Sequence, residues 1–223
     1  MAVRRITRES QVTEYKSSWQ DEYYEWICGY ANSRGGKLYV GVNDDGFVVG
    51  LADTRFLLDE LPNKTVSLMG VMLDIDHFVA DTRGENIKHA IVPSDIACKP
   101  ANLYARGVLT KQAVIDIDRA PNDISLATPA VNALYESAPS LVKQLRSNDG
   151  YRKKLAGDLA SWERSNPIHI APDGSLEYVC ISVQPYPYGI SLYGHYYIRS
   201  GGTTREITGI ALNNFEPSVV SVG

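Results

Sequence analysis

The sequence predicts an α+β fold, in which packed helices cover a mixed, mostly antiparallel sheet that a partly helical insertion interrupts. Two observations predict it. Strand-like alternation of apolar and polar residues appears near both ends of the chain, at residues 12–17, 37–42 and 175–185. Helical periodicity dominates between them, over residues 129–164. Strands that are grouped apart from helices are typical of α+β folds.

The first fifty residues predict a strand, a helix and a hairpin. VTEYKS at 12–17 alternates as a short strand, and an apolar stripe from Tyr23 to Ala31 predicts a helix that Gly35 and Gly36 end. We expect Ser17 or Ser18 to cap this helix at its N-terminus. Residues 37–42 and 47–51 are then expected to pair as a hairpin around the turn Asn43-Asp44-Asp45-Gly46.

Further elements follow along the chain. A helix is predicted to start at residues 54–61, Pro62-Asn63 either interrupts or restarts the helical pattern, and a strand is expected at 71–78. Short strands are expected at 89–93 and 113–118. The remaining predictions are helices at 130–137, 139–146 and 152–164, strands at 175–185 and 194–202, and a closing helix at 208–215.

Composition limits the class of protein. Hydrophobic residues make up 44% of the 223 residues and charged residues 22%, as in ordinary globular proteins. No apolar run approaches the roughly 18 residues of a membrane span, so no membrane association is expected. Three widely separated cysteines predict no zinc site and suit a cytoplasmic protein. With a net charge of −4, any nucleic-acid binding must depend on a local basic patch.

Three segments carry a resemblance to a known family. They are ESQVTEYK at 9–16, ANSRGGKLYVGVNDDGFVVG at 31–50 and YYIRSGGTTREITGIALNNF at 196–215. In this order they resemble the Schlafen AlbA_2 domain, found in many bacterial regulators and in the animal Schlafen proteins. The resemblance implies a core domain over residues 1–78 and 176–223. Residues 79–175 depart from the pattern and are interpreted as an inserted α/β or helical subdomain.

The resemblance implies nucleic-acid binding, and we expect a DNA-binding transcriptional regulator in the bacterial cytoplasm. Phosphates favour cations next to exposed backbone N–H groups and hydroxyls, which the RSGGTTR loop at 199–205 offers. A second loop, SRGGK at 33–37, offers the same on a smaller scale. The expected binding residues are Lys16, Arg34, Lys37, Arg199, Thr203, Thr204 and Arg205. The simpler alternative is that RSGGTT forms only a turn between a strand and a helix.

A metal-dependent nuclease is the first functional alternative. The resemblance to animal Schlafens with endoribonuclease activity places an acidic triad on Glu9, Glu14 and Asp44. Three converging carboxylates would hold Mg²⁺ or Mn²⁺, which prefer oxygen ligands and activate water for attack on a phosphate. The simpler interpretation is that Asp44 belongs to ordinary turn chemistry and that the glutamates are solvated or pair with Lys16. We therefore expect binding rather than catalysis.

A protein-interaction or nucleotide-binding module is the second alternative, although the sequence contains neither a Walker motif nor a G-x-G-x-x-G motif. Both DNA and RNA remain open as partners, and so does a homo-oligomer. One further basic run lies within the expected insertion, where it either widens a nucleic-acid groove or forms a solvated helix face. Its members are Lys143, Arg146, Arg152, Lys153 and Lys154.

Overall fold

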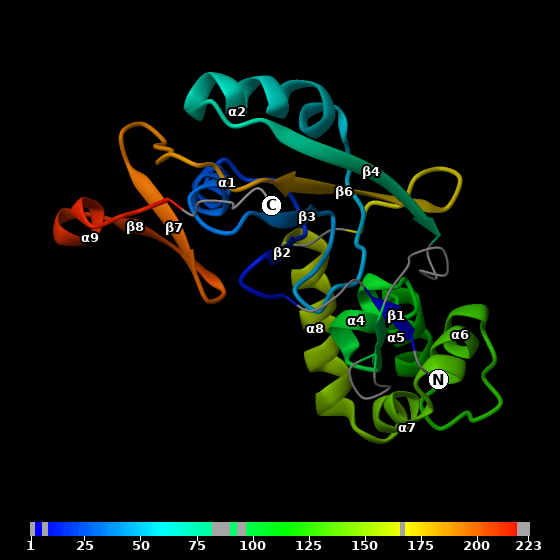
Figure 1. The fold of residues 1–223 in the computed structure, drawn as a ribbon. Helices are drawn as coiled ribbons and strands as arrows, with labels where there is room; N and C mark the ends of the chain where they lie inside the picture. Colours follow the sequence, from blue (N-terminus) through cyan, green and yellow to red (C-terminus); the bar gives the residue numbers. More distant parts are fainter. Residues whose placement is uncertain (1–2, 6–8, 82–89, 93–96, 166–167, 218–223) are drawn as a thin grey trace. The chain divides into compact units, whose positions relative to one another are not determined.

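The computed structural model, shown in Figure 1, describes residues 3–5, 9–81, 90–92, 97–165 and 168–217. The chain divides into two compact units. We call the first the core unit, which comprises Thr7–Gly46, Gly50–Val79 and Glu177–Gly223. We call the second the helical unit, which comprises Met1–Ile6, Phe47–Val49 and Ala80–Leu176.

A four-stranded mixed sheet organises the core unit. Its strand order is β2, β3, β6, β4, with bounds β2 Thr13–Lys16, β3 Gly36–Val40, β6 Ser175–Val183 and β4 Leu73–Asp81. Strands β2 and β3 are parallel, with Glu14 opposite Leu38. Strands β3 and β6 are antiparallel, with Leu38 opposite Ile181. A mixed sheet together with helices confirms the predicted α+β class.

Two helices bury apolar side chains in the core of this unit. Helix α1 (Tyr23–Ala31) contributes Ile27, which is fully buried with Leu38 of β3. A π-helical turn, Phe56–Glu60, leads into α2 (Leu61–Met69), whose Leu61 is buried in the same cluster. Of the two outcomes predicted at Pro62, the structure shows the restart, because α2 begins at Leu61 after the π-helical turn. Pro62 lies in the first turn of α2, where a missing N–H leaves no hydrogen bond unmade.

A separate antiparallel ribbon packs on α1. It consists of β7 (Tyr196–Ser200) and β8 (Thr203–Ile207), with Arg199 opposite Thr204. Strand β8 was not predicted, because its TTREI sequence is mostly exposed and lacks an apolar face of its own. RSGGTT is therefore a turn between two strands rather than between a strand and a helix. Helix α9 (Gly209–Asn213) follows and confirms the closing helix.

The helical unit has its own apolar core. The elements of this unit are α4 Pro100–Ala105, α5 Lys111–Arg119, α6 Pro129–Ser137, α7 Pro139–Ser147 and α8 Asp149–Ser165, together with the antiparallel strands β1 Val3–Arg5 and β5 Ala90–Val92. Ile117, Leu134 and Leu145 are fully buried in the cluster that these helices share. Strand β5 confirms the predicted strand at 89–93 within the described residues, and the helices predicted between 130 and 164 are present.

Two predicted strands are wrong. Residues 113–118 lie in α5, where Thr110 caps the helix by accepting a hydrogen bond from the Ala113 N–H. Residues 47–51 do not form the second strand of a hairpin. The turn itself is present, since the Gly46 N–H donates to Asn43 at 2.7 Å. The chain after it departs because Phe47 and Val49 pack against Ala105 of the helical unit.

The ends of α1 also differ from the prediction. Its N-cap is Glu22 rather than Ser17 or Ser18, and no described side chain caps it. The helix ends at Ala31, before the two glycines, and Gly35 then turns the chain with φ +72° while its N–H donates to Tyr30 at 3.0 Å. Within the part of the chain that the structure describes, no helix combines the length and the apolar character needed to cross a membrane.

Candidate nucleic-acid interface

A buried ion pair joins two of the predicted site residues. Arg199 Nη2 lies 2.8 Å from Glu14 Oε2, and the Arg199 side chain is only 1% exposed. Lys16 Nζ lies 3.1 Å from the other carboxylate oxygen, Oε1. Both oxygens of Glu14 are thus engaged by cations of the chain itself. A buried carboxylate needs such partners, because desolvation without them is costly.

Arg199 holds the ribbon in place instead of facing the surface. Its Nη1 donates to Thr204 Oγ1 at 3.1 Å, its Nε donates to the Gln11 carbonyl at 3.4 Å, and its guanidinium lies 4.9 Å from the centre of the Tyr30 ring. Its backbone N–H also donates to Ser33 Oγ at 2.9 Å. These contacts connect β7 to β2, to α1 and to the loop after α1. In this arrangement the guanidinium is not available to an external phosphate.

The ribbon has an inner and an outer face. Directly opposed residues of an antiparallel pair share a face, and successive residues alternate. Arg199 and Thr204 therefore share the inner face, toward α1. The pairs Ile198–Arg205 and Ser200–Thr203 share the outer face. Arg205 is exposed there and donates to the Ser200 hydroxyl, while the Thr203 hydroxyl donates to the Ser200 carbonyl at 3.0 Å.

The other basic candidates do not converge on one point. Lys16 shares the face of Glu14, and its Nζ lies 4.6 Å from the centre of the Trp26 ring of α1. Lys37 precedes the fully buried Leu38 of the core face, so its side chain starts from the opposite face of the sheet, where it is exposed. Arg34 is exposed in the loop after α1, directly after the Ser33 that receives the Arg199 N–H.

Two of the three candidate carboxylates, Glu9 and Glu14, already have hydrogen-bonding partners within the chain. Glu9 is exposed as a residue, but its Oε1 accepts the Tyr15 N–H at 3.1 Å; desolvation of the carboxylate raises its pKa while that hydrogen bond lowers it. The charges of Glu14 and Asp44 raise this pKa further. Among the residues that the structure describes, no group of three or more His, Cys, Asp or Glu side chains could hold a metal ion. To bind Mg²⁺ or Mn²⁺, Glu14 would have to share its oxygens with Lys16 and Arg199 or release them.

Three of the five residues of the predicted basic run form ion pairs within the helical unit. Arg152 is buried, and its Nε lies 2.9 Å from Asp118 while its Nη2 lies 3.0 Å from Asp149. Lys153 and Lys154 pair with Asp149 and Asp158 at 2.8 Å and 3.1 Å, one turn away along α8. These contacts favour a stabilised helix surface over a nucleic-acid groove.

Sequence reasoning missed the residues that position the ribbon. Gln11, Ser33 and Trp26 each contact one of the predicted basic residues. One sequence signal was Gly29 inside α1, since helix interiors disfavour glycine unless another element approaches closely. A Cβ at Gly29 would lie 3.1 Å from Thr204 Cγ2 of the ribbon.

Comparison with known proteins adds one match. Residues 9–118 match the family model described as Schlafen, AlbA_2. No curated protein and no solved structure matches the chain. The matched residues include Glu9, Glu14, Lys16 and Asp44 but end before the ribbon.

Proposed function

We propose that this protein binds duplex DNA without cleaving it and acts as a transcriptional regulator in the bacterial cytoplasm. The proposal is supported by the match of residues 9–118 to the Schlafen AlbA_2 family model, because this family is generally associated with nucleic acids. The outer face of the β7–β8 ribbon is the contact surface in this proposal. A two-stranded β-ribbon fits the major groove of B-form DNA in width.

Charge and hydroxyl groups on the ribbon suit phosphate contacts. Arg205 supplies a guanidinium, Thr203 a hydroxyl, and Gly201 and Gly202 leave the backbone of the turn accessible. Arg34 is exposed in the loop that Ser33 ties to β7, and in this proposal it supplies a second, separate phosphate contact. Phosphate contacts position a protein on the duplex and weaken as salt rises. Sequence preference is therefore expected to be weak.

The remaining predicted residues have supporting roles in this proposal. Arg199 and Thr204 position the ribbon from its inner face, and Lys16 neutralises Glu14. Lys37 lies on the other face of the sheet and is left out of the contact surface. The proposal thus depends on Arg205, Arg34 and Thr203.

One observation carries the choice of binding over cleavage. Both oxygens of Glu14 are engaged by Lys16 and Arg199, so a metal at this carboxylate would compete with two cations of the chain itself. A nuclease that uses Glu9, Glu14 and Asp44 would need the Arg199 pair to open first. Opening it would release the ribbon from β2 and leave a buried cation unpaired.

The test measures binding and cleavage in the same reactions. The full chain is incubated with labelled duplex DNA and with labelled structured RNA, each with Mn²⁺ or with EDTA, beside the variants Glu9→Ala and Asp44→Ala. These two carboxylates are exposed, so both variants are expected to fold. We expect tighter binding to the duplex DNA, equal in EDTA and Mn²⁺, and intact polymers. Cleavage that needs Mn²⁺ and is lost in either variant would establish the nuclease instead, and binding to neither polymer would refute the proposal.

A further inference from the structure

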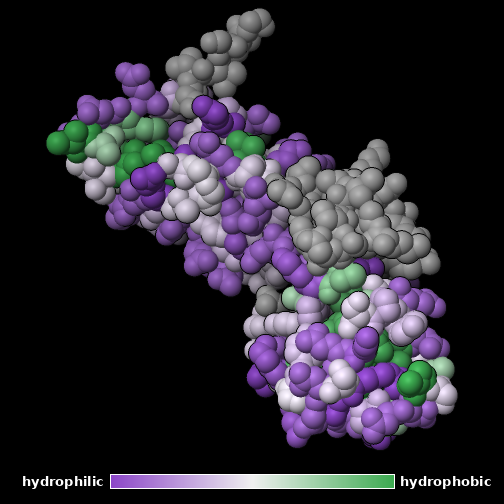
Figure 2. Space-filling view, turned by 90° about the horizontal axis from the view of Figure 1, so that it is seen from below, coloured by the Kyte–Doolittle hydropathy of each residue, from purple (hydrophilic) through white to green (hydrophobic). Residues whose placement is uncertain are grey.

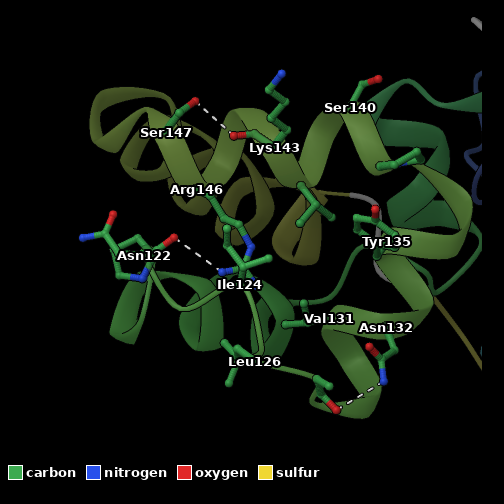
Figure 3. Close-up of a pocket in the computed structure, with 14 residues that line it drawn as sticks. Asn122, Ile124, Leu126, Val131, Asn132, Tyr135, Ser140, Lys143, Arg146 and Ser147 are labelled. Atoms are coloured by element: carbon green, nitrogen blue, oxygen red, sulfur yellow. Dashed lines mark hydrogen bonds between the residues drawn. The ribbon is translucent and has the colours of Figure 1, made fainter.

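A second candidate site lies in the helical unit, in a cleft of about 780 Å³ between the loop at 120–128 and the helices α6 and α7. Figure 3 shows Ile124 and Leu126 of the loop and Val131 and Tyr135 of α6 around the same space. All lining residues lie beyond residue 118, outside the part of the chain that matches the family model. The cleft is thus independent of the proposed DNA surface.

Large apolar side chains at this cleft are exposed to an unusual degree. Ile124 is 89% exposed and Tyr135 59%, although both face a partly apolar cleft. Figure 2 shows hydrophobic surface that interrupts the hydrophilic surface of this unit. Exposed isoleucine and tyrosine side chains beside a cleft are stabilised when an apolar group fills it.

The polar lining of the cleft is cationic. It contains Lys143 and Arg146 but no carboxylate among the fourteen lining residues that the structure describes. The Arg146 guanidinium donates to the carbonyls of Pro121 and Asp123, so its charge is held by neutral acceptors. The nearby Asp123 carboxylate is engaged by Ser125, whose N–H and hydroxyl donate to it at 2.9 Å and 2.6 Å. Lys143 also lines the cleft, where the described lining residues place no carboxylate beside it.

We propose that this cleft binds a small amphipathic anion, with an apolar body between Ile124, Val131 and Tyr135 and one carboxylate or phosphate group near Lys143 and Arg146. Its volume lies in the range of roughly 300–1,000 Å³ that is usual for small-molecule sites. Amides of Asn122 and Asn132 and the hydroxyl of Ser140 offer orienting hydrogen bonds at the rim. Arg146, already positioned by two carbonyls, is pre-organised for an anion.

Two fluorescent probes test this on the full chain. One is 1-anilinonaphthalene-8-sulfonate, which is anionic, and the other is the neutral N-phenyl-1-naphthylamine. The variants are Lys143→Gln and Ile124→Ser, and Arg164→Gln of α8 is the matched control because it removes one exposed positive charge of the same unit. Cooperative urea unfolding of each variant confirms that the probes report on folded protein.

We expect Lys143→Gln to reduce the affinity for the anionic probe at least fivefold and to leave the affinity for the neutral probe unchanged. Ile124→Ser should reduce the affinity for both probes, and the control variant should change neither affinity. Competition by 2-naphthoate and by 2-naphthyl phosphate then distinguishes a carboxylate from a phosphate ligand. The proposal is overturned if the anionic probe does not bind, if it binds equally to all variants, or if the control loses as much affinity as Lys143→Gln.

Discussion

The guanidinium of Arg199 lies 2.8 Å from the carboxylate of Glu14, across 185 residues of sequence. This buried contact joins the ribbon to the first strand of the sheet. It also occupies the carboxylate that the nuclease alternative would need for a metal. One contact therefore both positions the ribbon and engages a carboxylate of the predicted acidic triad.

Loss of this arginine should destabilise the fold. In Arg199→Ala, the Glu14 carboxylate stays buried with only Lys16 beside it. We expect the free energy of unfolding to fall by about 3–5 kcal/mol, as for other buried pairs that lose one partner. Urea unfolding followed by circular dichroism measures this change.

The exposed Arg205 provides the control. Arg205→Ala should change the same free energy by less than about 0.5 kcal/mol, as is usual at exposed sites. A double-mutant cycle of Arg199→Ala and Glu14→Ala then measures the interaction between these two residues, and we expect a coupling free energy above about 1 kcal/mol. A coupling near zero would show that Arg199 and Glu14 do not interact as described.

A glycine that leads into β3 should not tolerate a side chain. Gly35 has φ +72°, and a Cβ there would lie 2.6 Å from the Val183 carbonyl oxygen. Gly35→Ala should therefore lower the free energy of unfolding by about 2 kcal/mol or more. Gly202→Ala is the control in the same unit, since a Cβ there meets nothing within 4 Å. Equal effects of the two changes in thermal unfolding would be inconsistent with this backbone geometry.

Thiol reactivity should separate the three cysteines. Burial raises the pKa of Cys28 to about 11 and also raises that of Cys180, whereas Cys98 is partly exposed. At pH 8 only ~0.1% of a thiol with such a pKa is thiolate, the reactive form. We expect dithionitrobenzoate to modify Cys98 in the native protein and the other two only after unfolding. Rapid native modification of more than one thiol would contradict the burial described.

The raised pKa of Cys28 also predicts that the free energy of unfolding depends on pH. Its pKa in the folded chain lies above the ordinary value of 9.0, so the unfolded chain ionises first as pH rises. The free energy of unfolding should therefore fall between pH 9 and pH 11. Cys28→Ala should reduce this fall, and an unchanged slope in that variant would assign the effect to other groups.

Charges on α8 should matter little for DNA binding. Lys153 and Lys154 already pair with Asp149 and Asp158. We expect Lys153→Gln and Lys154→Gln each to change duplex affinity by less than twofold in a fluorescence anisotropy titration. A loss of tenfold or more would move the contact surface toward the helical unit.

Periodicity predicted most of the elements, and the errors have physical causes. Residues 113–118 alternate like a strand, yet Thr110 caps a helix whose Ala113 and Ile117 fill the core of the helical unit. Residues 47–51 do not form the second strand of a hairpin. Phe47 and Val49 instead pack with Ala105 of α4. Both outcomes depend on tertiary contacts that a local pattern does not contain.

The arrangement of the candidate site residues could not be predicted from the sequence. The sequence places Arg199 and Arg205 in one loop, and only the strand pairing reveals that one faces inward and the other outward. Likewise, Glu14 was expected to meet other carboxylates or Lys16, and its contact with Arg199 required the chain to return after 185 residues. Which cations are free for a ligand is thus decided by the fold.

The salt dependence of duplex DNA binding tests the account most directly. The logarithm of the binding constant is measured against the logarithm of salt concentration for the unmodified chain, for Arg205→Gln and for the control Arg164→Gln. We expect Arg205→Gln to weaken binding and to reduce the slope by about 1, the loss of one phosphate contact. We expect no change in the control. An unchanged affinity and slope in Arg205→Gln would contradict the proposal that the outer face of the ribbon binds DNA.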